Sequence, residues 1–201
     1  RASIVFSGGA GAGKTTALNA LSAYIPDTER IVTIEDAAEL RLQREHVVRL
    51  ESRPPNVEGA GAIDIRTLVR NTLRMRPDRI IIGECRGAEA FEMLQAMNTG
   101  HEGSMTTIHA NSTNDAMGRI ENMLAMTGLE IPVSALRDYL ASAIDLVVQL
   151  ERIPGGRRVF SAVSQVEEVK DGRLVLGEIH RFTQQGVDAE GFAHGIYQST
   201  G

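Results

Sequence analysis

The chain has 201 residues, of which 42% are hydrophobic, and it carries a formal net charge of −5. This length and composition fit one folded domain and argue against disorder. An acidic balance with 4% aromatic residues argues against a broad nucleic-acid-binding surface, and a single cysteine excludes a disulfide framework and a cysteine-based zinc site.

Strand and helix patterns alternate through the first 144 residues. Strands are expected at 3–7, 30–34, 46–50, 79–83 and 104–109, and helices at 14–24, 64–74, 88–98, 114–125 and 133–143. Asp64 stands where it can cap the second of these helices, whose apolar side chains share one face. The alternation predicts an α/β fold with a mainly parallel sheet between helices.

The pattern changes after Asp145. Three strand-like runs follow at 146–150, 158–169 and 174–181, separated by a Pro-Gly-Gly turn at 154–156 and an Asp-Gly hairpin signal at 171–172. They predict an antiparallel β appendage at the sheet edge. Residues 184–201 are Gly-rich and weakly patterned, and only partial order is expected there. We therefore divide the chain into an α/β core at 1–144 and a β-rich extension of the same domain at 145–201.

The strongest motif is the run Gly-Gly-Ala-Gly-Ala-Gly-Lys-Thr, which matches G-x-x-x-x-G-K-[ST] between an apolar strand and a helix. Small residues let backbone N–H groups surround a phosphate at a helix N-terminus. Lys14 is then expected to reach the β- and γ-phosphates, and the Thr15 hydroxyl to bind Mg²⁺. The glycines do not follow the dinucleotide spacing G-x-G-x-x-G. The predicted nucleotide-binding residues are Gly8, Gly9, Ala10, Gly11, Ala12, Gly13, Lys14, Thr15 and Thr16.

Lysine is scarce in this chain, since 19 of the 21 basic residues are Arg and only Lys14 and Lys170 are Lys. The positive charge of the chain is thus supplied almost entirely by Arg. A compact ammonium on a flexible stem fits between two phosphates where a planar guanidinium would crowd the loop. The exception at Lys14 supports the phosphate-binding role.

Three predicted strands end in polar side chains that could act on a bound nucleotide. Glu35 follows the strand at 30–34, Glu84 follows the strand at 79–83, and His109 follows the strand at 104–108. Ligands of parallel sheets bind at the carboxyl ends of the strands, so these residues are catalytic candidates. Glu35 could instead cap a short helix that follows it, and His109 could be structural. His101 is a further candidate, although it could only contact the end of the preceding helix.

Arginines form a second group. Arg66, Arg70 and Arg74 recur every four residues and therefore lie on one face of the predicted helix, with Arg86 further along. One interpretation is a solvated face paired with local acids. The other is a subunit interface, with an Arg pointing at a neighbour's phosphate.

Four linked motifs resemble the type II/type IV secretion ATPases. They are the phosphate loop at 8–16, Ile-Glu-Asp-Ala-Ala-Glu-Leu at 34–40, the run at 73–87 that ends in Gly-Glu-Cys-Arg-Gly, and the run at 98–111 that begins Asn-Thr-Gly-His. They look like the Walker A, Asp box, Walker B and His box of that family. The residues Glu-Cys-Arg-Gly and Asn-Thr-Gly-His in the last two motifs are most similar to those of the Tad/Flp pilus assembly ATPases (CpaF).

The resemblance implies a RecA-like ATPase that uses ATP and Mg²⁺ in a hexameric ring on the cytoplasmic side of the bacterial inner membrane. Such rings work with inner-membrane platform proteins to drive pilus assembly, retraction or secretion. It places Glu84 in Walker B, Glu35 in the Asp box, and His101 and His109 in the His box. The family's N-terminal domain is missing from this chain, so weak turnover is expected. A nucleotide-gated scaffold and a nucleic-acid translocase are the alternatives, although no nucleic-acid partner is expected.

Overall fold

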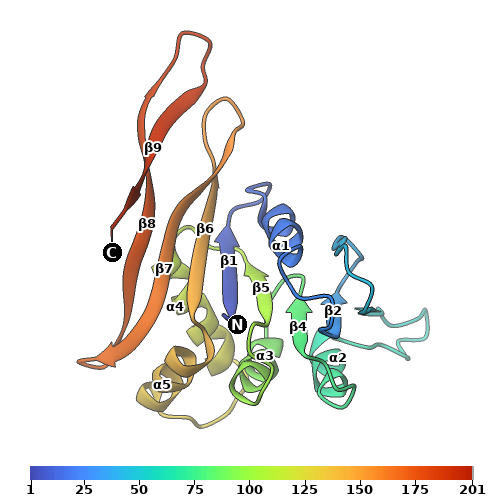
Figure 1. The fold of residues 1–201 in the computed structure, drawn as a ribbon. Helices are drawn as coiled ribbons and strands as arrows, with labels where there is room; N and C mark the ends of the chain where they lie inside the picture. Colours follow the sequence, from blue (N-terminus) through green and yellow to red (C-terminus); the bar gives the residue numbers. More distant parts are fainter. Residues whose placement is uncertain (201) are drawn as a thin grey trace.

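A computed structural model describes residues 1–200 (Figure 1). Its elements, in chain order, are β1 (Ile4–Gly8), α1 (Lys14–Ser22), β2 (Ile31–Glu35), β3 (Val47–Glu51), α2 (Ile65–Thr72), β4 (Arg79–Ile82), α3 (Glu89–Asn98), β5 (Met105–Ile108), α4 (Thr113–Ala125), α5 (Val133–Ala143), β6 (Leu146–Arg152), β7 (Arg158–Lys170), β8 (Arg173–Val187) and β9 (Ala193–Ser199). Each helix predicted from the sequence is present, with ends that shift by no more than a few residues.

Within residues 1–200, one sheet contains the strands in the order β3-β2-β4-β5-β1-β6-β7-β8-β9. The pairs from β3 to β6 are parallel, and the pairs from β6 to β9 are antiparallel. The long strands β7 to β9 form the ribbon at the left of Figure 1. The predicted α/β fold with an antiparallel extension is therefore confirmed.

β6 belongs to the parallel part of the sheet, although the sequence pattern grouped it with the antiparallel runs. It pairs with β1 from Ile4↔Leu146 to Gly8↔Leu150. Its other edge pairs with β7 in the antiparallel direction. β6 therefore joins the parallel and antiparallel parts of the sheet. The antiparallel part begins at β6, which lies directly beside β1.

Residues 173–199 form a hairpin of β8 and β9, so the weakly patterned segment from 184 onward is ordered as far as the structure describes it. β8 continues to Val187, and β9 pairs with it in the antiparallel direction. Tyr197 stacks on His180 with ring centroids 5.2 Å apart and packs against Phe182 at 5.0 Å. These cross-strand contacts form only when the hairpin closes, which explains why local patterning did not reveal them.

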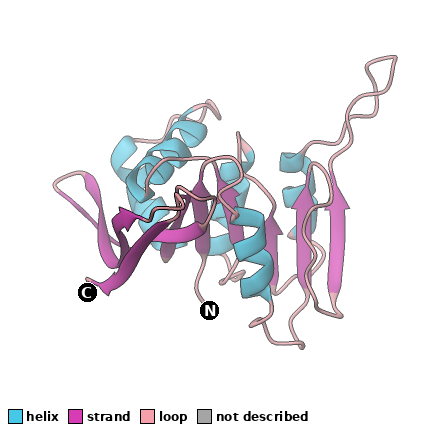
Figure 2. Ribbon diagram, turned by 90° about the horizontal axis from the view of Figure 1, so that it is seen from above, coloured by secondary structure: helices cyan, strands magenta, loops and turns pink. Residues whose placement is uncertain are grey.

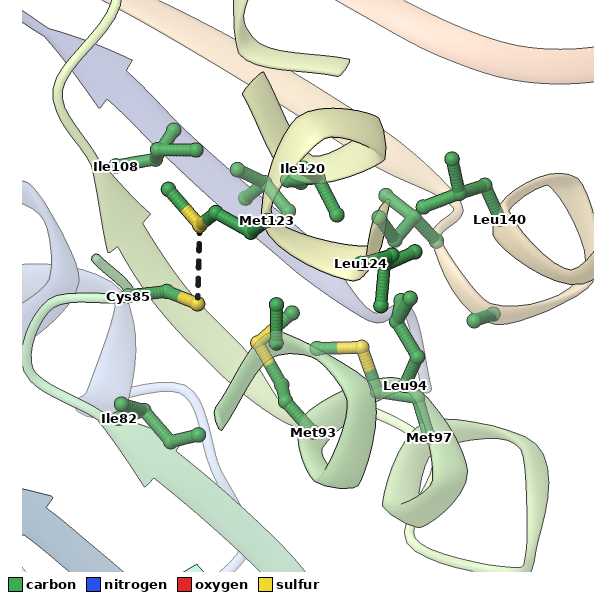
Figure 3. Packing of buried hydrophobic residues seen from close by; sticks show 14 of the residues in the cluster. Ile82, Cys85, Met93, Leu94, Met97, Ile108, Ile120, Met123, Leu124 and Leu140 are labelled. Atoms are coloured by element: carbon green, nitrogen blue, oxygen red, sulfur yellow. Dashed lines mark hydrogen bonds between the residues drawn. The ribbon is translucent and has the colours of Figure 1, made fainter. Parts of the chain in front are cut away.

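Helices cover both faces of the sheet (Figure 2), because alternate side chains of each buried strand point to opposite faces. In β4, Ile80 and Ile82 belong to the core beneath α2, α3, α4 and α5, while Ile81 belongs to the core beneath α1. Figure 3 shows the larger core, in which Cys85 Sγ lies 3.9 Å from Met123 Sδ. Burial raises the pKa of the Cys85 thiol well above its ordinary value, so this cysteine is a packing residue.

Replacing the α2 cap Asp64 with alanine is expected to lower the free energy of unfolding by about 1 kcal/mol. The Asp64 carboxylate accepts a hydrogen bond from the Thr67 backbone N–H at 2.7 Å, as predicted. Hydrogen bonds to Thr67 lower the pKa of Asp64 from its ordinary 3.8. Since folding lowers this pKa, the stabilisation is present above pH 4 and is lost as the pH falls through the folded-state pKa.

Urea unfolding at pH 7 and near pH 2 would measure this loss. Asp64→Asn is the matched control, because asparagine is an equally good cap and should retain most of the stability. If Asp64→Ala and Asp64→Asn lowered the free energy of unfolding equally, the hydrogen bond to Thr67 would not be the source of the stabilisation.

Candidate nucleotide-binding site

The phosphate loop connects β1 directly to α1, as the motif predicts. Gly8, Gly11 and Gly13 adopt positive φ angles of 156°, 70° and 95°. A side chain at these positions would strain the loop, so the glycines permit the turn itself. At Gly8 a Cβ would also lie 2.5 Å from the Leu150 carbonyl oxygen, so β6 closes tightly against the start of the loop.

Lys14 is the first residue of α1, and its side chain folds back over the loop. Its Nζ donates hydrogen bonds to the carbonyl oxygens of Gly8 at 2.8 Å and Gly9 at 3.0 Å. Burial lowers the pKa of Lys14, an effect that the Glu84 carboxylate opposes and the Arg86 guanidinium reinforces. The ammonium is thus held at the mouth of the loop, where it can reach a phosphate.

The carboxyl ends of β2, β4 and β5 surround a hollow of about 320 Å³ beside the loop. It is lined by Lys14, Thr15, Glu35, Asp36, Ala37, Glu39, Gly83, Glu84, Arg86 and Thr107. The sheet therefore brings the loop lysine together with both predicted carboxylates. Thr107 was not predicted, since it reads as a buried strand residue, and its hydroxyl donates to the Gly83 carbonyl at 2.7 Å.

Glu84 stands at the rim of this hollow and pairs with Arg86. The Arg86 Nε donates to Glu84 Oε2 at 2.8 Å, and an Arg86 terminal nitrogen lies 3.6 Å from Asp36. The hydrogen bond and charge of Glu84 raise the pKa of Arg86. In this chain Arg86 thus contacts the proposed catalytic carboxylate directly.

Glu35 is 5% exposed and lies deeper in the hollow. Its Oε1 accepts backbone hydrogen bonds from Glu39 at 3.0 Å and Leu40 at 2.9 Å. No helix lies between β2 and β3, a stretch that the structure describes in full, so the expected short helix that Glu35 would cap is absent. Gly83 makes room for the Glu35 side chain, since a Cβ on Gly83 would lie 2.9 Å from Glu35 Cγ. Glu35 therefore binds the backbone of the segment after β2 and lines the hollow at the same time.

The two histidines occupy different places. His109 follows β5 at the edge of the sheet that carries the loop, but its exposed side chain is not among those lining the hollow. His101 precedes β5, at the opposite edge, and its Nδ1 lies 3.2 Å from the Ala96 carbonyl at the end of α3. Within this chain His101 contacts the helix end and not the loop. Catalytic roles for both stay predictions.

The arginine stripe of α2 is partly neutralised by α3. Arg66 Nε lies 2.7 Å and Arg70 Nε 3.1 Å from the same oxygen of Glu92, which is 2% exposed. Arg74 is exposed. Arg66 and Arg70 are therefore paired with an acidic residue of the same chain, Glu92. An interface role stays a prediction for these two arginines and for Arg74 and Arg86.

A second hollow of about 500 Å³ lies on the other side of Lys14 and Thr15. It is lined by Gly11, Ala12, Gly13, Lys14, Thr15, Thr16, Glu39 and Arg158. Arg158 was missed because it lies 147 residues after Gly11, whose carbonyl it contacts, and belongs to no local motif. Only the path of β6 and β7 brings it here.

A family model described as "Type II/IV secretion system protein" matches residues 1–187. The chain belongs to this family. It is 44% identical over 174 residues to the putative conjugal transfer protein Rv3659c of Mycobacterium tuberculosis strain H37Rv, an alignment that covers 87% of this chain and 49% of the relative. The chain spans about half the length of the curated relatives it matches.

Solved structures of the family have the same fold. The VirB11 ATPase of the Brucella suis type IV secretion system, determined with sulphate, superimposes with a TM-score of 0.72 at 34% identity, over 82% of this chain and 48% of that one. The pilus retraction motor PilT with bound ADP gives 0.63 at 26% identity, over 88% and 47%. The RecA-like fold is therefore confirmed, and the Tad/Flp subgroup stays a prediction.

Proposed function

We propose that this chain is the ATP-hydrolysing motor domain of a machine for secretion or for pilus assembly or retraction. The observation that carries the proposal is the convergence of Lys14, Glu84 and Glu35 around one hollow at the mouth of the phosphate loop. A glycine loop alone would bind phosphate. The carboxylates add the groups that hydrolysis needs.

The loop and α1 would bind the triphosphate. Lys14 exchanges its hydrogen bonds to the Gly8 and Gly9 carbonyls for the β- and γ-phosphates, and the N-terminus of α1 adds its partial positive charge. The Thr15 hydroxyl and the nearby carboxylates form an oxygen-rich donor set that suits Mg²⁺. When bound, Mg²⁺ neutralises charge that develops on the phosphates.

Glu84 would orient the attacking water and accept its proton. Arg86 now occupies Glu84 Oε2, so the arrangement leaves Oε1 for the water unless Arg86 moves away. Glu35 keeps one oxygen on the backbone of Glu39 and Leu40, which fixes its second oxygen in the hollow. The site thus contains a carboxylate paired with an arginine at the rim and a carboxylate bound to backbone N–H groups below it.

The pairing of Arg86 with Glu84 also favours the alternative of a nucleotide-gated scaffold with little turnover in this chain alone. A second subunit or a further domain could draw Arg86 away and free Glu84. We also propose a ring for the whole protein, since a head-to-tail interface can close by rotation, and the resemblance to the secretion ATPases implies six subunits.

We place the ring on the cytoplasmic side of the inner membrane, against platform proteins of the machine. The family membership, together with the similarity to the VirB11 ATPase of a type IV secretion system and to the pilus retraction motor PilT, supports an association with such a machine. Among residues 1–200 no helix is long and apolar enough to cross a membrane.

Phosphate release measured against protein concentration tests the motor proposal. The specific activity of the longer parent protein should rise steeply with concentration as subunits associate, while the 201-residue chain should bind Mg·ATP and turn it over slowly. Binding without turnover by the parent at every concentration would favour the scaffold, and failure of both proteins to bind Mg·ATP would refute the nucleotide site.

A further inference from the structure

Arg158 approaches the phosphate loop from a part of the chain that no sequence motif includes. It is the first residue of β7, after the turn that follows β6, and β6 pairs with β1 as far as Gly8. The Arg158 Nε donates a hydrogen bond to the Gly11 carbonyl at 3.1 Å. Its Cδ lies 3.2 Å from the position that a Cβ on Gly13 would take, so the side chain lies directly against the loop.

The side chain of Arg158 lines the hollow of about 500 Å³ that also contains the first turn of α1. Within residues 1–200, no carboxylate forms an ion pair with it, and its one hydrogen bond uses Nε. Glu39 is the acidic residue of the same hollow. The two terminal nitrogens therefore keep their hydrogen-bonding capacity beside Lys14 and Thr16, where the loop predicts a phosphate.

We infer that Arg158 is a nucleotide-binding residue, supplied within the same chain by the β6–β7 hairpin, whose terminal nitrogens bind the phosphates. The inference deepens the proposed function and rests on it, because it requires a polyphosphate in the loop. A planar guanidinium binds two phosphate oxygens at once, whereas an ammonium acts as a point charge. Lys14 thus serves the phosphates from inside the loop, and Arg158 from outside.

The absence of a side chain at Gly13 is part of this arrangement. A β-carbon there would lie 3.2 Å from Arg158 Cδ, and the arginine stem would have to shift by a few tenths of an ångström. The same glycine has a φ of 95°, so it serves both the turn and the approach of Arg158. Nucleotide binding would in consequence hold the β6–β7 hairpin against the loop.

Replacing Arg158 with alanine in the 201-residue chain tests the inference. The Kd for Mg·ADP, measured by calorimetry, should rise about tenfold, the lower end for loss of a charged hydrogen bond. The Kd of Arg158→Lys should lie between those of the unsubstituted chain and Arg158→Ala, because lysine keeps the charge but cannot bind two phosphate oxygens at once. The melting temperature without nucleotide should not change, since Arg158 is exposed, while the increase caused by Mg·ADP should shrink.

Arg157→Ala is the matched control, because Arg157 is the exposed neighbour in the same turn and carries the same charge. It should leave the Kd within twofold. An unchanged Kd for Arg158→Ala, in a series where Lys14→Ala abolishes binding, would overturn this inference and leave the proposed function standing. An equal weakening by Arg157→Ala would also overturn it, and an unsubstituted chain that binds no Mg·ADP would refute both.

Discussion

Lys14→Arg is expected to raise the Kd for Mg·ATP by at least about 100-fold, although the charge is kept. The Lys14 ammonium lies 2.8 and 3.0 Å from two loop carbonyls, a space that suits a compact group. A planar guanidinium is wider, and its longer fork would enter the volume that the phosphates need. Titration with a fluorescent ATP analogue measures the change.

Lys170→Arg is the matched control, because Lys170 is the chain's other lysine and ends β7 on the surface. It should bind Mg·ATP like the unsubstituted chain. Binding by Lys14→Arg within threefold of that value would show that only the charge of this residue matters, and the steric account of its selection would fail.

Glu84→Gln should keep Mg·ATP binding and lower the turnover number, measured as phosphate release, by about 100-fold or more. An amide still accepts the hydrogen bond from Arg86 Nε, which now reaches Glu84 Oε2 at 2.8 Å, so the local structure should survive. It cannot accept a proton from water, and the chemical step therefore slows.

Glu102→Gln makes the same chemical change at an exposed residue that precedes β5, at the opposite edge of the sheet, and should leave turnover unaffected. Undiminished phosphate release by Glu84→Gln would assign proton transfer to another group. Glu35 would then be the next residue to replace, because it is the buried carboxylate in the same hollow.

Local patterns were enough to predict the loop and the strand ends around it. Gly8 to Thr15 are consecutive, and Glu84 directly follows the apolar run of β4, so each signal lies within a few residues. Contacts across the fold were not predictable in this way. Arg158 meets Gly11 only because β6 lies between β1 and β7.

The fate of the α2 arginines shows the same limit. Spacing placed Arg66 and Arg70 on one helix face, which the structure confirms, but their shared partner Glu92 lies on another helix. A periodic pattern gives the direction of side chains and says nothing of what packs opposite them. β9 is a further example, because it forms a strand by pairing with β8 and has no clear strand pattern of its own.

The glycine at position 83 has a consequence for where the negative charge of the site originates. The volume that its side chain would fill is taken by Glu35 of the neighbouring strand, whose Cγ would be 2.9 Å from a new Cβ. One carboxylate fits there, from β2 or from β4, and not both. An aspartate introduced at 83 would displace Glu35 from the backbone N–H groups of Glu39 and Leu40. A side chain at position 83 and Glu35 in its present conformation therefore exclude each other.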